Sequence, residues 1–289
     1  MKSWVYHLIY GVIIACLIWM VFYFQHKTQE LSKSLSMIQR RIDQTKKELD
    51  IERAVRRRQE EARKKVVPSA LKPKVAIVLD DWGYNLKNFE VASNLGCPIT
   101  FSILPNLPYS RRIAVAAMES GNEVILHLPL EPYEDLPLEK DTITTAMTEK
   151  EAAKIFDNQV ASMPEITGIS NHMGSKATED KRVMTPIFKR MKKRGLYYLD
   201  SVVTSKSVAG ELCGGIGVRF AARSVFLDNE LSTEHVKKQV EELARVAREK
   251  GSAVGVGHDR AVTIAVLAEM LPRLQEMGIE IVPVSKIAK

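Results

Sequence analysis

The stretch VAIVLDDWG, residues 75–83, decides the fold that we expect for most of this chain. Five apolar residues end in two adjacent acids, Asp80 and Asp81. Adjacent side chains of a strand point to opposite faces, so both carboxylates can serve one site only where the backbone turns at the strand's end. Taken alone, DDWG would more simply be a surface turn.

Short apolar runs alternate with amphipathic segments from Lys74 onward, which indicates β/α units with parallel strands. A capping box of Thr148 and Glu151 begins one helix, and Gly195 and Gly251 end others. We expect eight strands, the first seven each followed by a helix. They are Val75–Asp81, Ile99–Leu104, Val124–His127, Ile166–Ser170, Leu196–Asp200, Val218–Ala222 or Val225–Asp228, Ala253–Gly257 and Ile279–Val284. Such units favour an α/β fold, a distorted parallel (β/α)7-8 barrel, with the active site at the carboxyl ends of its strands.

The net charge of +7 belongs to the amino-terminal part of the chain. Of the 42 Lys/Arg and 35 Asp/Glu, residues 1–65 hold 14 and 7, which leaves residues 66–289 with 28 of each sign. Binding to a phosphate backbone depends on clustered cations. We therefore expect no nucleic-acid partner for the neutral part.

Residues Trp4–Phe24 form a stretch of 21 residues without a charged side chain. At about 1.5 Å per residue it would span the roughly 30 Å hydrocarbon core of a bilayer. Aromatic residues at both ends suit the two interfaces, and no small-residue cleavage pattern follows. We expect residues 1–25 to be a single-pass transmembrane anchor, with a buried hydrophobic helix as the alternative.

The segment after the anchor carries an apolar stripe at spacings of four and three, formed by Leu31, Leu35, Ile38, Ile42, Thr45 and Leu49. This stripe predicts a short coiled-coil stalk over residues 26–65, and through it a homodimer. A solvated helix with a chance stripe is the alternative. Residues 66–73, with two prolines, are expected to be a linker to a barrel domain over residues 74–289.

Ionisable side chains stand at the expected ends of several strands. His127 lies in HLPLEP, His172 in GISNHMGS, Asp200 in YYLDS and His258 in GVGHD. Each alone is more simply structural, but the carboxyl ends of parallel strands meet on one rim. Asp81, His127 and His172 would form a set of two histidines and one carboxylate that leaves positions open on a divalent metal. Zinc is the default, and iron, cobalt or manganese are alternatives.

The order of these motifs resembles that of the polysaccharide deacetylase family, specifically its divergent bacterial branch. The similar motifs are DDWG, ITFSILP, HLPLEP, NHMGS and VGHD, within residues 74–289. The resemblance implies a hydrolase that removes acetyl groups from an N-acetylated envelope polysaccharide. It implies these roles: Asp80 as base, Asp81, His127 and His172 as metal ligands, and His258 as acid.

Two features leave alternatives open. Ordinary members of that family carry two metal-binding histidines in one motif, whereas HLPLEP has only His127, with Glu131 nearby. Either His172 supplies the missing ligand from another strand or Glu131 does. Asp200 would orient His258 or a metal ligand. A non-catalytic envelope scaffold or regulatory module, or a metal hydrolase of another amide or ester, are the rival functions.

The expected side of the membrane follows from the function and not from the charges. Lys27, Lys33, Arg40 and Arg41 follow the anchor, and the positive-inside rule alone would keep the domain in the cytoplasm. An activity on envelope polysaccharide requires the opposite, so we expect the barrel domain on the periplasmic or extracytoplasmic side. Cys97 and Cys213 could be two thiols or one disulfide.

Overall fold

The computed structural model describes residues 19–20, 22–23, 25–29, 39, 46, 72–163 and 165–289. The chain divides into two units, Met1–Ala70 and Leu71–Lys289. The described residues of the first unit are helical, and the rings of Trp19 and Tyr23 stack at 5.7 Å. Among the described residues, no helix is both long enough and apolar enough to cross a membrane. Most of the expected anchor, Trp4–Phe24, and of the stalk stripe, Leu31–Leu49, lies outside these residues, so both stay predictions.

The second unit is built on one parallel sheet of nine strands in the order β6-β5-β4-β3-β2-β1-β8-β7, with β9 paired to β1. The strands are β1 (Lys74–Trp82), β2 (Thr100–Ile103), β3 (Glu123–Leu130), β4 (Gly168–Met173), β5 (Tyr197–Asp200), β6 (Phe220–Ala222), β7 (Val225–Phe226), β8 (Ser252–His258) and β9 (Glu280–Ile281). Every expected strand segment contains at least part of an observed strand.

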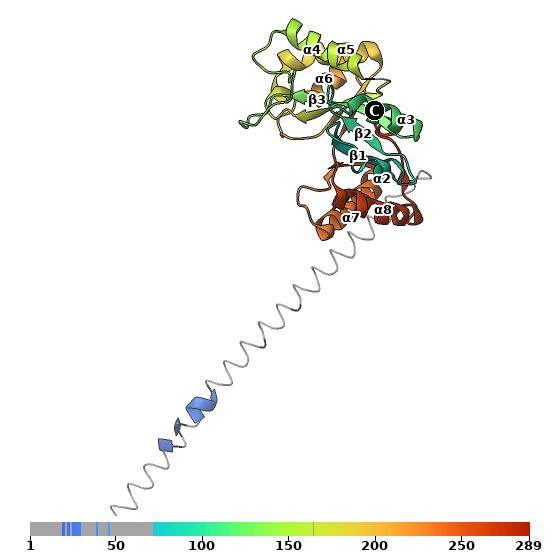
Figure 1. The fold of residues 1–289 in the computed structure, drawn as a ribbon. Coiled ribbons are helices and arrows are strands. Elements are labelled where there is room, and N and C mark those ends of the chain that lie inside the picture. Colours follow the sequence, from blue (N-terminus) through green and yellow to red (C-terminus); the bar gives the residue numbers. More distant parts are fainter. Residues whose placement is uncertain are drawn as a thin grey trace, which may run out of the picture. The chain divides into compact units, whose positions relative to one another are not determined.

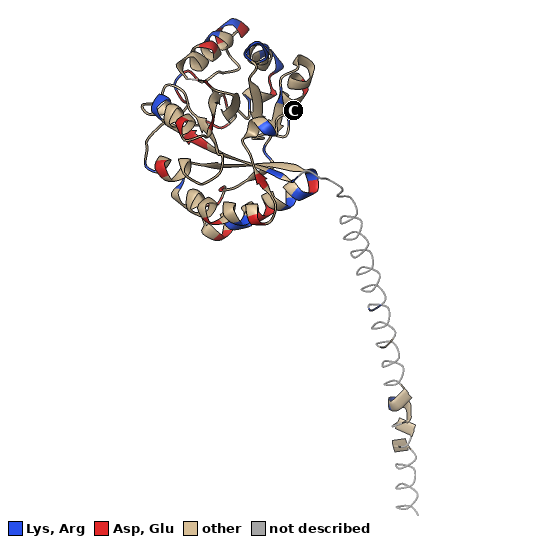
Figure 2. Cartoon of the chain, turned by 90° about the vertical axis from the view of Figure 1, so that its right-hand side faces the viewer, with Lys and Arg blue, Asp and Glu red and all other residues tan. Residues whose placement is uncertain are grey.

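Seven α-helices and two short 3-10 helices connect these strands. They are α2 (Phe89–Ser93), α3 (Ser110–Glu119), α4 (Glu149–Ser162), η1 (Ala177–Glu179), α5 (Lys181–Arg194), α6 (Ala209–Ile216), α7 (Thr233–Lys250), α8 (Ala261–Glu276) and η2 (Val284–Lys286). The helices α7 and α8 pack together beside β1 and β8, whereas α4, α5 and α6 form the other end (Figure 1). The capping box of Thr148 and Glu151 is present, and Gly195 and Gly251 end α5 and α7 in the left-handed conformation. Both signs of charge are interspersed on the helices in view (Figure 2).

The sheet curls as expected for a distorted barrel, but it is not closed by backbone pairing. Its two edges are β6 and β7, although only Arg223 and Ser224 separate these strands in the sequence. The amide of Arg223 donates to Asp200 O at 2.9 Å on one side, and that of Ser224 donates to Val254 O at 2.8 Å on the other. We call this two-residue link the seam.

The structure corrects two expectations about the strands. Val218–Ala222 and Val225–Asp228 were alternatives for one strand, but each contains a short strand, and no helix separates them because a two-residue link cannot hold one. The expected last strand, Ile279–Val284, is mostly irregular: β9 has two residues, and Pro283, which lacks an amide hydrogen, precedes η2.

Alternation along the strands divides the apolar side chains into two clusters. The outer cluster joins strands to helices and takes Val75, Ile77 and Leu79 from β1. The inner cluster takes Ala76 and Val78 from β1 and adds Ile125, Tyr197, Leu199, Ala221, Val254, Val256 and Val284. Side chains alternate along a strand. A polar residue that stands two positions after an inward-facing apolar residue therefore also faces inward at the end of its strand.

Candidate metal centre

Three side chains from three strands converge at the carboxyl ends of the sheet. Asp81 of β1, His127 of β3 and His172 of β4 each place one ligand atom within 4.8 Å of the others. Asp81 Oδ1 lies 3.3 Å from His127 Nε2 and 3.0 Å from His172 Nδ1. His127 and His172 stand inside paired segments of β3 and β4, so their backbones are fixed more firmly than those of loop residues would be.

The end of β1 brings two adjacent carboxylates to this site. Asp80 follows Ala76 and Val78 in the inward-facing row, and Asp81 would face outward on a regular strand. Instead Asp81 has φ of 66°, and the register of β1 against β2 shifts between Leu79 and Trp82. A left-handed residue other than glycine costs roughly 1–2 kcal/mol, and here it turns the second carboxylate back toward the first. The expected backbone turn is confirmed.

The donor atoms fit a divalent metal. Asp81 Oδ1 is buried and makes no hydrogen bond of normal geometry, and an uncompensated buried oxygen is unfavourable. Burial opposes ionisation of Asp81, but His127 and His172 outweigh it and hold the pKa of this carboxyl well below its usual range. Asp81 therefore offers a carboxylate, and two imidazoles with one carboxylate are a common set for zinc and for other divalent ions.

A chain of polar contacts joins Asp80 to His127. Ser102 donates to Asp80, which lowers the pKa of that carboxyl against the effect of burial. The Oγ atoms of Ser102 and Ser170 lie 2.8 Å apart, and Ser170 Oγ lies 2.8 Å from His127 Nδ1. These contacts link Asp80 to His127 through two hydroxyls, and His127 Nε2 faces Asp81 Oδ1 at 3.3 Å.

Asp80 lies beside the three converging side chains and is almost fully buried, with 3% of its surface exposed. Its Oδ1 has no hydrogen-bond partner and lies 3.8 Å from His127 Nδ1. Burial raises the pKa of Asp80 above its usual range, although His127 opposes the shift. A carboxyl with a raised pKa and a free oxygen is suited to accept a proton.

His258 faces the same site from the end of β8, where it continues the inward row of Val254 and Val256. Its Nε2 lies 3.8 Å from Asp81 Oδ2, and its Nδ1 lies 2.8 Å from Asp228 Oδ1. Burial lowers the pKa of His258, but Asp228 and the site's carboxylates outweigh it, so the net pKa is raised. His258 is therefore an oriented imidazole whose protonated form is favoured.

Asp228, which the sequence reasoning did not assign, holds His258 in place. It is fully buried, and its Oδ2 accepts from the His258 amide at 2.9 Å and from Thr263 Oγ1 at 2.7 Å. It lies two residues after Phe226, which packs on the inner cluster. The period of two along VFLD could have placed its carboxylate inward.

Asp200 does not have the orienting position that we expected. Its carboxylate accepts from Val202 N at 2.8 Å and from Ser207 Oγ at 2.7 Å, and the partner of His258 is Asp228. The reason is the alternation of side chains along β5. Asp200 stands two residues after Tyr198, which packs in the outer cluster, so its side chain lies on the opposite face from Leu199, which faces inward.

Glu131, the alternative ligand, is engaged elsewhere. Its Oε1 lies 2.8 Å from Lys176 Nζ, and its Oε2 accepts from both the amide and the hydroxyl of Thr145 at 2.6 Å. Among the described residues, the group of converging ligands contains His172 and not Glu131.

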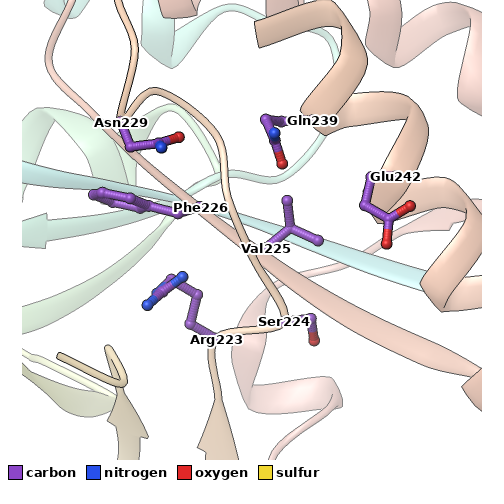
Figure 3. Close-up of a pocket in the computed structure, with 7 residues that line it drawn as sticks. All are labelled: Arg223, Ser224, Val225, Phe226, Asn229, Gln239 and Glu242. Atoms are coloured by element: carbon purple, nitrogen blue, oxygen red, sulfur yellow. The ribbon is translucent and has the colours of Figure 1, made fainter. Parts of the chain in front are cut away.

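Two side chains, Arg223 of the seam and Phe226 of β7, lie near His258. The ring of Phe226 packs edge-on against His258 with centroids 5.3 Å apart, and the guanidinium of Arg223 lies 4.9 Å from the centre of the Phe226 ring. Arg223 donates to Ser201 O at 2.6 Å and to Val202 O at 2.9 Å. Figure 3 shows Arg223 and Phe226 beside each other at a pocket that Gln239 of α7 also lines. Side chains thus close the barrel where the backbone does not.

This chain is similar to known bacterial proteins in both sequence and structure. The family model described as divergent polysaccharide deacetylase matches residues 77–288. The uncharacterized protein YibQ of Escherichia coli K12 is 35% identical over 201 residues, which are 70% of this chain and 63%, less than two-thirds, of that protein. An uncharacterized protein of Haemophilus influenzae is 34% identical over 203 residues, 70% of this chain and 72% of its own. The crystal structure of uncharacterized protein ATU2773 from Agrobacterium tumefaciens C58 has a TM-score of 0.72 at 26% identity, over 77% of this chain and 92% of that one.

Proposed function

The chain belongs to the divergent polysaccharide deacetylase family, and from this premise we propose that it is a metal-dependent hydrolase of acetyl groups on an N-acetylated envelope polysaccharide. One observation carries the proposal. The three converging side chains Asp81, His127 and His172 stand next to a buried carboxyl, Asp80, and an oriented imidazole, His258. The first three suit a metal, and the other two suit proton transfer.

A divalent metal on Asp81, His127 and His172 would supply a Lewis acid that lowers the pKa of a water and polarises the acetamide carbonyl. Asp80 Oδ1, which has no hydrogen-bond partner, is placed to take a proton from the attacking water. His258 Nε2 would donate a proton to the departing amine nitrogen as the C–N bond breaks, while Asp228 holds Nδ1. The products are acetate and a free amino group on the sugar.

The arrangement of Asp80 and His258 favours an enzyme over the metal-binding scaffold considered from the sequence. A scaffold needs the metal ligands, but it gains nothing from a buried, unpartnered carboxyl oxygen or from a second buried carboxylate that orients His258. A buried carboxyl oxygen without a partner is unfavourable for stability, so its presence supports a use in chemistry.

The membrane position extends this proposal. The uncharged stretch Trp4–Phe24 supports a single-pass anchor over residues 1–25, followed by a stalk over residues 26–65 that would join two chains, and a linker over residues 66–73. The barrel domain, residues 74–289, would then lie on the periplasmic or extracytoplasmic side, where envelope polysaccharide is found. Protease digestion of intact spheroplasts tests this orientation: cleavage in the linker is expected only if the domain is outside.

The activity is tested by release of acetate. Full-length protein in detergent, supplied with zinc, is incubated with hexa-N-acetylchitohexaose and with peptidoglycan, and acetate is measured. The matched control is Asp80→Asn, which should keep the metal and lose the activity. Full metal occupancy without acetate from either glycan would contradict the proposed hydrolysis and favour the scaffold.

A further inference from the structure

Tyr84 presents a fixed aromatic ring in the loop that follows β1. It follows Asp81 by three residues, and half of its surface is exposed. Its hydroxyl donates to the carboxylate of Glu139 in the loop between β3 and α4. Partial burial, Glu139 and Asp81 together raise the pKa of Tyr84. The ring is therefore held in one orientation while it remains open to solvent.

Tyr133 has the same construction in the loop that follows His127. It is 62% exposed, and its hydroxyl donates to Glu179 Oε2 at 2.9 Å. Its amide donates to Ser175 Oγ at 2.9 Å, three residues beyond His172. Glu179 also accepts from Thr204 Oγ1 at 2.6 Å, so the ring is tied to the loops that follow β4 and β5.

The loop that carries Glu139 and Tyr133, residues 131–148, is itself firmly attached. Glu131 is bound by Lys176 and Thr145, and Ile143 is fully buried and bridges to Leu130 of β3. The loop is thus held at both ends. Between them it exposes Leu136 and Leu138, which adds apolar surface to the loop that carries Tyr133.

From these contacts we infer that Tyr84 and Tyr133 are stacking platforms for pyranose rings of the glycan chain, an inference that rests on the proposed function. The C–H face of a pyranose packs on an aromatic ring, and a tyrosine has an apolar body with a polar tip. Because each hydroxyl is already tied to a carboxylate, little conformational freedom is lost when a sugar binds. Two such rings, on the loops after β1 and β3, bind a chain of several sugars better than a single acetylated sugar.

The charge of the domain favours a glycan over an anionic ligand. Residues 66–289 carry equal numbers of cations and anions, and the two tyrosines are bound by carboxylates. A phosphorylated or nucleic-acid ligand would be repelled by Glu139 and Glu179, whereas sugar hydroxyls can donate to them.

Calorimetry with hexa-N-acetylchitohexaose, soluble peptidoglycan strands and monomeric N-acetylglucosamine tests this inference. Full-length protein carrying Asp80→Asn is used so that the probes are not consumed. Tyr84→Ala and Tyr133→Ala should each weaken binding of an oligomer about tenfold, whereas Tyr84→Phe and Tyr133→Phe should stay within about threefold, because the ring remains. Tyr109→Ala is the matched control: this residue is exposed on the loop after β2, and no partner of its hydroxyl is found in the described residues.

The outcomes separate this inference from the proposed hydrolysis. Equal losses of affinity in the Phe and Ala variants would mean that the tyrosines only hold their loops in place, and would contradict the stacking platforms. Binding of an oligomer no tighter than that of the monomer would contradict them too, as would no binding of either glycan. Acetate release with unchanged KM in the Ala variants would also overturn them while the activity stands. If the protein releases no acetate but the Ala variants still lose glycan binding, the stacking platforms stand and the proposed hydrolysis is wrong.

Discussion

His258 Nδ1 lies 2.8 Å from Oδ1 of Asp228, a carboxylate with no exposed surface. The contact fixes both the orientation and the charge of the imidazole, because a buried anion favours a proton on its partner. It also leaves Nε2 as the atom that faces the centre, 3.8 Å from Asp81 Oδ2. In the proposed hydrolysis, Asp228 would therefore act through His258.

Replacement of Asp228 by Asn should remove the charge and keep the shape. We expect cleavage of an acetamide to fall about 100-fold or more, with the metal retained. Asp228 raises the pKa of His258, and the acid works only below that pKa, so the alkaline limb of the pH–rate profile should move to lower pH. An unmoved limb, with activity lost, would show that Asp228 does not set the charge of His258.

The metal ligands should behave differently from Glu131. Asp81→Ala, His127→Ala and His172→Ala should each strip a divalent metal, because two remaining ligands hold it far more weakly than three. Glu131→Gln should keep it, since both oxygens of Glu131 are bound by Lys176 and Thr145. Metal content per chain, measured after dialysis, decides this. Full occupancy in His172→Ala together with loss in Glu131→Gln would reverse the assignment.

Strand periodicity explains how far the sequence alone could predict the site. Asp80, His127 and His258 follow inward-facing apolar residues at a spacing of two, and their convergence could be predicted from the motifs at the strand ends. The same spacing of two, applied to YYLD and VFLD, predicts that Asp200 faces outward and Asp228 faces inward. Position at a strand end, used without parity, assigned Asp200 to the rim and left Asp228 only as the end of the alternative strand Val225–Asp228.

The rest depends on long-range packing that no local pattern encodes. The left-handed backbone at Asp81 is held by its surroundings and not by its own preference. The seam between β6 and β7 arises because a curled sheet brings its two edges to adjacent residues. The serines that join Asp80 to His127 come from β2 and β4, and neither ITFSILP nor GISNHMGS marks them as more than strand residues.

Gly168 offers a test of packing inside the barrel. A Cβ there would lie 2.5 Å from the ring of Tyr197, whose hydroxyl donates to the buried carboxylate of Glu123 at 3.0 Å. Gly168→Ala should therefore destabilise the domain by about 1–3 kcal/mol, the usual effect of overpacking. The control is Gly214→Ala in α6, where a Cβ meets nothing; it should be neutral or stabilise by about 0.5–1 kcal/mol. Equal melting temperatures for the two variants would contradict the packing described here.

Asp80 and His258 should set opposite limbs of one pH–rate profile. Asp80 acts as a base only when ionised, and burial raises its pKa, so the acid limb should lie above the usual range of an aspartate. His258 acts only when protonated, and its raised pKa should extend activity toward higher pH before the alkaline limb begins.

Asp80→Asn should lower acetamide cleavage about 100-fold or more at unchanged metal content. His258→Ala should slow the acetamide far more than 4-nitrophenyl acetate, because nitrophenolate departs without a proton whereas an amine does not. Equal losses on the two substrates would remove the general-acid role from His258 and leave Asp80 as the only proton-transfer group.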